Sequence, residues 1–144
     1  MDAKLKHLDL IQSIITRMAN NSFLLKGWAV TLLSGIFALA WNQESIWHFI
    51  LAYIPVVMFW FLDSYYLQQE RLYRGLYDKV RQTDEGSITF SMIPPPVAEK
   101  ETYQYFKVLF SKTESGFYVP LIILITIILI SDVANVGCHC AGVV

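Results

Sequence analysis

Two apolar stretches near the N-terminus decide the fold of this chain. The first is GWAVTLLSGIFALAW at residues 27–41, and the second is IWHFILAYIPVVMFWFL at residues 46–62. A membrane-spanning helix needs about 20 mainly apolar residues, with about 17 as the practical minimum, and a few flanking residues bring both stretches to that length. Only residues 42–45 separate them, so the two helices must form an antiparallel hairpin.

A third apolar stretch, FYVPLIILITIILI, occupies residues 117–130 and can extend to residue 136. Its uniform apolarity is typical of a lipid-facing helix at the rim of a bundle. Of the 144 residues, 55% are apolar and 16% are charged, whereas an average soluble domain has roughly 25% charged residues. A soluble domain of this size could not bury three such helices. The sequence therefore predicts an all-α membrane protein with three transmembrane helices.

The distribution of basic residues predicts the orientation. All of them precede the first span or lie between the second and third spans, and none lies in the 42–45 loop or after residue 130. By the positive-inside rule, the N-terminus is cytoplasmic and the C-terminus is external. The eleven basic residues are Lys4, Lys6, Arg17, Lys26, Arg71, Arg74, Lys79, Arg81, Lys100, Lys107 and Lys112.

Five segments follow from these patterns. They are a cytoplasmic amphipathic helix (1–22), the transmembrane hairpin (23–62), a cytoplasmic helical extension with a Pro-containing insert (63–116), the third transmembrane helix (117–136) and an external tail (137–144).

The amphipathic character of the first segment comes from Leu8, Ile11, Ile15 and Met18, which recur at heptad spacing. Such a helix either lies on a membrane surface or self-associates, or it packs against the protein's own cytoplasmic part. The sequence leaves these alternatives open.

Small residues form a candidate packing stripe in the first span. Gly27, Thr31 and Gly35 stand four apart on one face of the helix, and Ala38 lies close to them. Small side chains let the backbones of membrane helices approach closely. We expect the stripe to face the second span, with a second copy of the chain as the alternative.

Three ionisable residues lie near the predicted membrane boundaries. Lys26 opens the first span and Asp63 ends the second, so in an antiparallel hairpin they reach a similar depth and form a candidate ion pair. Asp132 follows the third span. It is either a carboxylate just outside the membrane or, in an oligomer, part of a ring at a cation-selective pore mouth.

The second helix is predicted to continue into the cytoplasm and to end near residues 83–86, because its helical spacing persists through Leu67, Leu72, Leu76 and Val80. Its tyrosines and arginines are candidates for docking a cytoplasmic protein or anionic headgroups. These candidates are Arg71, Tyr73, Arg74, Tyr77 and Arg81.

No pattern in the chain indicates catalysis or a cofactor. Cys138, His139 and Cys140 are too closely spaced for a usual zinc site and lack the remaining ligands. No serine–histidine–acid set or phosphate-binding glycine loop is present, and a net charge of −1 gives no basic field for nucleic acid. We expect neither an enzyme, nor a metal or cofactor site, nor a nucleic-acid-binding protein.

Several short motifs together resemble a recurrent group of small bacterial membrane proteins. They are KGW at 26–28, LDSYYLQQERLYRGLYDKVR at 62–81, FSM at 90–92, SKT at 111–113 and FY at 117–118. The resemblance covers most of residues 15–130 and implies a bacterial inner-membrane location. More loosely, the hairpin that continues into a cytoplasmic helix is similar to SLATT-type effectors of bacterial nucleotide-signalling defence, which are thought to permeabilise membranes as oligomers. This chain differs in its third span and in having no recognisable nucleotide-sensing domain.

Two functional hypotheses follow. The first is a homo-oligomeric inner-membrane protein that forms a pore or perturbs the membrane, in antiphage defence. The second is a non-conducting membrane anchor or adaptor whose extension docks a cytoplasmic protein.

Overall fold

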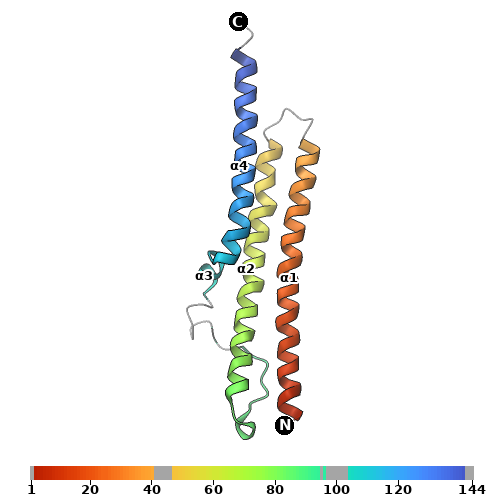
Figure 1. Ribbon diagram of the computed structural model, residues 1–144, viewed down its shortest axis with the longest axis vertical. Coiled ribbons are helices and arrows are strands. Elements are labelled where there is room, and N and C mark those ends of the chain that lie inside the picture. The colour runs from red at the N-terminus through yellow and green to blue at the C-terminus, as the bar shows by residue number, and fades with distance from the viewer. Residues whose placement is uncertain (1, 41–46, 95, 97–103, 142–144) are drawn as a thin grey trace.

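The computed structural model describes residues 2–40, 47–94, 96 and 104–141. Its regular elements are all helical. They are α1 (Asp2–Ala40), α2 (Trp47–Gln82), the short 3₁₀ helix η1 (Glu85–Ser87), α3 (Tyr105–Leu109) and α4 (Lys112–Ala141). Figure 1 shows α1 and α2 side by side as a long antiparallel hairpin, with α4 beside α2.

Three helices are long and apolar enough to cross a membrane, as the sequence predicts. They lie within Asp2–Ala40, Ile50–Gln82 and Lys112–Val133. The 39 residues of α1 span roughly 58 Å at about 1.5 Å per residue, which is well beyond a hydrocarbon core of about 30 Å. The hairpin is therefore much longer than one bilayer crossing requires.

Helix α1 is unbroken, so the amphipathic segment and the first span belong to one helix. Its buried residues recur four or seven positions apart along its whole length, in the manner of a coiled-coil seam. They are His7, Ile11, Ile15, Ser22, Ala29, Leu33 and Ala40. One continuous stripe of α1 therefore faces α2 from end to end.

The N-terminal half of α1 packs on the C-terminal half of α2. Ile11 and Ile15 form a buried cluster with Leu76 and Val80. The partly buried side chains around this cluster are Leu8, Tyr73, Tyr77 and Met92. Of the alternatives that the sequence left open for this amphipathic face, the structure shows packing against the protein itself.

Polar contacts tie the same end of the hairpin together. The Lys4 ammonium donates hydrogen bonds to the carbonyl oxygens of Thr83 (2.7 Å) and Arg81 (3.2 Å), just where α2 ends. A helix C-terminus leaves carbonyl groups without partners and carries partial negative charge, so a lysine stabilises it. The segment after η1 returns along α1, where Phe90 packs edge-on against the buried His7 ring.

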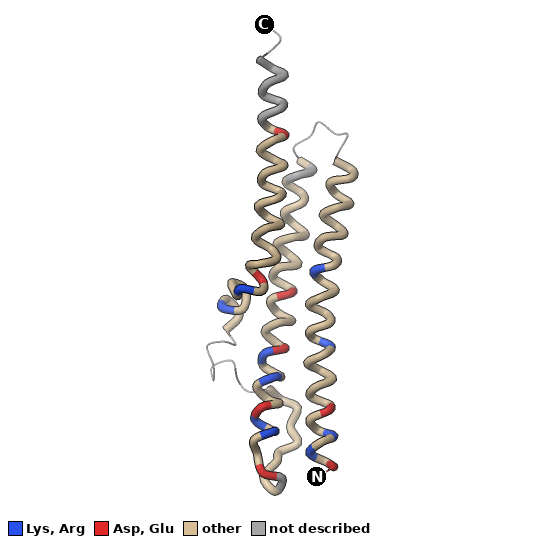
Figure 2. Tube along the Cα trace, in the orientation of Figure 1, with Lys and Arg blue, Asp and Glu red and all other residues tan. Residues whose placement is uncertain are grey.

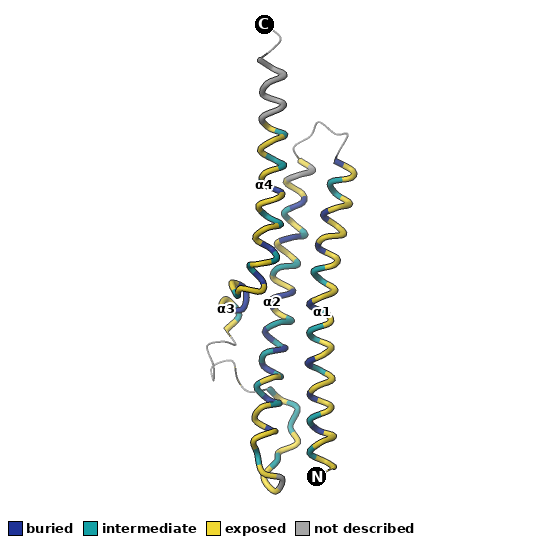
Figure 3. Tube along the Cα trace, in the orientation of Figure 1, coloured by how far each residue is buried: buried dark blue, intermediate teal, exposed yellow. Residues whose placement is uncertain are grey.

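A second apolar cluster joins all three long helices. Its buried residues are Ala29, Leu33, Ala52, Val56, Tyr118 and Ile125. Helices α1 and α2 each contribute one alanine and one aliphatic side chain, while α4 contributes the Tyr118 ring and Ile125. Figure 3 shows the buried positions of α1 and α2 turned toward each other, whereas most of the described part of α4 is exposed or half-buried. Such exposure agrees with a helix at the rim of a bundle.

Two hydrogen bonds hold α3 beside α2. The Trp60 indole Nε1–H donates to the carbonyl oxygen of Leu109 (3.0 Å). The Tyr105 hydroxyl donates to the carbonyl oxygen of Phe61 (2.8 Å). These contacts fix the position along α2 at which α4 begins. As a result, the first turn of α4 lies next to Asp63.

We predict that Ile11→Ala lowers the free energy of unfolding by about 2–5 kcal/mol, because it opens a cavity in the α1–α2 cluster. The neighbouring Leu10 is half exposed, so Leu10→Ala should change stability by about 0.5 kcal/mol or less. Thermal unfolding of the detergent-purified variants measures both effects. Equal shifts in the two variants would contradict the α1–α2 seam.

Candidate functional site

A cluster of charged side chains lies where α1, α2 and α4 meet. Lys26 lies on the α1 stripe that faces α2, between Ser22 and Ala29. In the antiparallel hairpin, this position comes opposite Asp63 of α2. Glu114 comes from the first turn of α4. Figure 2 shows the charged residues of the described chain, most of them in the half of the hairpin that holds the N-terminus.

The Lys26 ammonium holds the cluster together. It forms an ion pair with Asp63 through Oδ2, and a second one with Glu114 through Oε1 at 3.2 Å. It also donates to the Ser22 hydroxyl at 3.1 Å. An ammonium has three N–H donors, and these three acceptors match them.

The carboxylates of the cluster are fully buried. Asp63 and Glu114 are both 0% exposed, and the Lys26 side chain is 18% exposed. The Tyr118 hydroxyl donates to Asp63 Oδ2 at 3.0 Å, and the Tyr118 ring stacks on Trp60, with 5.9 Å between centroids. Aromatic rings therefore shield the carboxylates, and a buried charge needs such partners to be tolerated.

The cluster has more acceptors than donors. Asp63 Oδ1 and Glu114 Oε2 are buried and have no hydrogen-bond partner among the described residues. Two carboxylates also face a single ammonium, so the ionised cluster carries one net negative charge. A buried site with these properties is a functional candidate by default in a helix that can cross a membrane.

Sequence reasoning found two members of this cluster and missed the others. Lys26 and Asp63 are the residues proposed as an ion pair, and the structure brings them together. Glu114 and Tyr118 were not predicted to join them. The sequence did contain a signal for Glu114. Each apolar stretch has an ionisable residue near the end that adjoins the basic segments, and these residues are Lys26, Asp63 and Glu114.

The expectation that the small-residue stripe faces α2 is wrong. Gly27, Thr31, Gly35 and Ala38 are all exposed, and a Cβ atom added at either glycine would meet nothing within 4 Å. Residues of a helix turn by about 100° each, so these positions lie on the side opposite Ala29 and its buried neighbours. The α1–α2 seam uses Ala29, Leu33 and Ala40 instead.

The hydroxyls on the exposed side of α1 bond within their own helix. Thr31 Oγ1 donates to the carbonyl oxygen of Gly27 at 2.9 Å. Ser34 Oγ donates to the carbonyl oxygen of Val30 at 2.8 Å. The small-residue stripe therefore presents no unsatisfied donor to its surroundings and can face either lipid or another helix.

The predicted docking residues are divided between two environments. Tyr73 and Tyr77 are half-buried against the Ile11 cluster. Arg74 and Arg81 are exposed and pair within α2, with Glu70 at 2.7 Å and Asp78 at 3.7 Å. Arg71 is half-buried and also has an interaction partner. The tyrosines thus contribute to the hairpin, and only the arginines at 74 and 81 form an open surface.

Asp132 is far from the charged cluster. It lies in α4, is half-buried, and has one carboxylate oxygen without a partner. The 18 positions between Glu114 and Asp132 correspond to about 27 Å of helix, close to the thickness of a hydrocarbon core. The two carboxylates therefore stand about one membrane thickness apart.

Helix α4 continues to Ala141, so part of the predicted tail is helical. The side chains of Cys138, His139 and Cys140 lie outside the described residues. Within the described part, no group of three or more His, Cys, Asp or Glu side chains could hold a metal ion.

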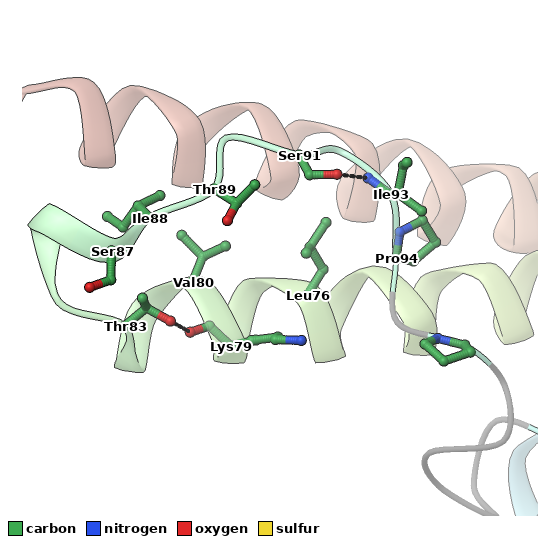
Figure 4. Close-up of a pocket in the computed structure, with 11 residues that line it drawn as sticks. Leu76, Lys79, Val80, Thr83, Ser87, Ile88, Thr89, Ser91, Ile93 and Pro94 are labelled. Carbon is green, nitrogen blue, oxygen red and sulfur yellow. Dashed lines mark hydrogen bonds between the residues drawn. The ribbon is translucent and has the colours of Figure 1, made fainter.

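A groove lies beside the last turns of α2. The returning segment 87–96 forms its other wall, and its volume is about 530 Å³. Figure 4 shows Leu76 and Val80 of α2 pointing toward this segment. Ile88, Ile93 and Pro94 line the opposite side. The groove is thus mainly apolar, with serine and threonine hydroxyls at its margin.

No family model, curated protein or solved structure matches this chain. The features that bear on function are the small-residue stripe of α1, the charged cluster around Lys26 and the groove beside α2.

We predict that Lys26→Met destabilises the protein by about 3–5 kcal/mol, because it leaves two buried carboxylates without a counter-ion. Lys112 is exposed at the start of α4, so Lys112→Met removes the same charge with an expected effect of about 0.5 kcal/mol or less. Chemical or thermal unfolding in detergent gives the comparison. A Lys26→Met protein as stable as Lys112→Met would show that the cluster does not hold the helices together.

Proposed function

We propose that the protein is a homo-oligomeric bacterial inner-membrane protein that forms a pore or perturbs the bilayer. The observation that carries this proposal is the exposed small-residue stripe of α1, Gly27, Thr31, Gly35 and Ala38. In lipid, helix association depends on close packing of backbones, and small residues permit it. Because α2 and α4 do not cover the stripe, we assign it to a second copy of the chain.

The orientation in this proposal follows from the basic residues. The half of the hairpin with the N-terminus carries most of the charges (Figure 2), and the positive-inside rule places that half in the cytoplasm. The Lys26 cluster then lies at the cytoplasmic boundary of the membrane. Asp132, about 27 Å farther along α4, lies at the external boundary, where copies in a ring would form a mouth with negative charge.

A pore built in this way would have an apolar, weakly hydrated constriction. Thr31 and Ser34 supply the hydroxyls on the exposed side of α1, and both are satisfied within their own helix. Hydrophobic constrictions gate by dewetting, so a small change in the distance between helices is enough to open or close them.

The long continuous helices suggest how a cytoplasmic signal would reach such a constriction. Both α1 and α2 run without a break from the Ile11 cluster into the apolar spans. A displacement at the cytoplasmic end therefore moves the spans directly. We extend the proposal to antiphage defence on the resemblance to SLATT-type effectors alone.

A non-conducting anchor or adaptor is the second candidate, and the groove beside α2 favours it. Leu76, Val80, Ile88 and Ile93 give this groove an apolar lining at the end of the molecule assigned to the cytoplasm. Pockets that take ligand groups are mostly apolar with a few polar atoms at defined positions. In this alternative, an apolar segment of a cytoplasmic protein would occupy the groove.

Native mass spectrometry in a mild detergent or nanodisc tests the assembly. We predict that the wild-type protein forms a ring of more than two copies and that Gly35→Leu reduces it to smaller species. Gly35 is exposed and a Cβ atom added there meets nothing within 4 Å in the single chain, so the hairpin should remain intact. Gly116→Leu is the matched control, because Gly116 is also a helical, exposed glycine with open space around it.

Ion flux into liposomes separates the two candidates. A pore predicts flux for the wild type and for Gly116→Leu, with loss of flux in Gly35→Leu. A wild-type monomer or dimer without flux would exclude the pore and favour the adaptor.

A further inference from the structure

The charged cluster lacks one positive charge. Lys26 contributes one, while Asp63 and Glu114 together contribute two negative charges at full burial. A buried charge without compensation is very costly, and proteins respond by pairing it or neutralising it. In the cluster as described, one carboxylate charge has no compensating partner.

Two unpartnered oxygens show where the excess negative charge of the cluster lies. Asp63 Oδ1 and Glu114 Oε2 are both buried and accept no hydrogen bond from the described residues. Both carboxylates contact the same ammonium nitrogen through their other oxygens, so they are close neighbours. Asp63 and Glu114 therefore form one cluster around Lys26, and each has one buried oxygen without a partner among the described residues.

Three donors beside the carboxylates already give their hydrogens to other acceptors. The ammonium of Lys26 donates to Ser22, Asp63 and Glu114. From α4, the Tyr118 hydroxyl already donates to Asp63 Oδ2. From α2, the Ser64 hydroxyl donates to the carbonyl oxygen of Trp60 at 2.8 Å. None of these three donors bonds to Asp63 Oδ1 or Glu114 Oε2 in the described structure, so both oxygens are open to a bound cation.

The chemistry of the site favours a single positive charge. Among the described residues, two carboxylates face the site, and the adjacent ammonium disfavours a divalent cation. The described residues also offer no third His, Cys, Asp or Glu ligand at this place. Uptake of one monovalent charge makes the cluster neutral.

We propose that Asp63 Oδ1 and Glu114 Oε2 bind one monovalent cation, either a proton shared between the carboxyl groups or an alkali-metal ion. This site links all three long helices, because Lys26, Asp63 and Glu114 come from α1, α2 and α4. Binding holds α4 against the hairpin, and loss of the cation leaves two carboxylates repelling each other across the α2–α4 contact. The proposal does not depend on the oligomer or the pore.

The two cations predict different behaviour of the melting temperature: a proton makes it depend on pH, and an alkali-metal ion makes it depend on the salt. If the cation is a proton, the folded state holds more protons than the unfolded state over the neutral range, so stability falls as pH rises. One proton corresponds to a fall in melting temperature of about 3–6 °C per pH unit for a chain of this size. If the cation is an alkali metal, the melting temperature rises when sodium or potassium replaces choline at fixed pH and ionic strength.

The test is thermal unfolding of the full chain in detergent, from mildly acidic to mildly alkaline pH, in choline, sodium and potassium chloride. Tryptophan fluorescence follows the unfolding, and one of the four tryptophans, Trp60, stacks on Tyr118, which bonds to Asp63. The melting temperature of the wild type should depend either on pH or on the presence of sodium or potassium. Glu114→Gln should lose this dependence, because the neutral amide removes one charge and can donate to Asp63 Oδ1.

Asp78→Asn is the matched control, because Asp78 is an exposed carboxylate of α2 paired with Arg81, and it should keep the wild-type dependence. Infrared spectroscopy of the wild type gives a second readout that does not rely on the stability of the variant. A protonated-carboxyl band identifies the proton, whereas a carboxylate band that shifts with sodium or potassium identifies the metal ion. A wild type without either band change, and with the same pH and salt dependence as Glu114→Gln, would overturn the proposal.

Discussion

The contact of the Lys26 ammonium with two buried carboxylates is the interaction on which the arrangement of the helices depends. Apolar packing alone defines the position of α4 poorly, because its surface is nearly uniform around the helix. A charged group at full burial is different, since it is tolerated only with its partners in place. The Lys26–Asp63–Glu114 contact therefore fixes both the depth and the rotation of the first turn of α4.

The aromatic contacts around the cluster reinforce this position. Trp60 stacks on Tyr118 and donates to the carbonyl oxygen of Leu109, so one α2 side chain contacts both α3 and α4. Tyr105 adds a second bond from α3 to α2. The entry into α4 is thus fixed by polar groups, while the rest of α4 packs through Tyr118 and Ile125.

The hairpin is a second unit with a different physical basis. A single seam runs along α1, from the Ile11 cluster through the charged cluster to the apolar cluster around Ala29 and Leu33. Because one continuous helix carries all three, its rotation in the apolar half is tied to its rotation in the charged half. That constraint turns Gly27 and Gly35 outward. The proposed assembly and the proposed cation site therefore lie on opposite faces of the same helix.

The amino-acid sequence by itself determined the three long apolar helices and placed Lys26 and Asp63 at a similar depth in the hairpin. Apolar length, heptad spacing and a four-residue connection are local features, and each has few structural solutions. Which face of α1 meets α2 was decided only by the tertiary structure, because the small residues Gly27 and Gly35 indicated one face, whereas Ala29 and Leu33 lie on the other. The long-range register with Ile11 and Ile15 selected one of them. Glu114 joined the cluster for the same reason: its partners lie 88 and 51 positions away along the chain, and only the packing of α3 and α4 on α2 brings them into contact.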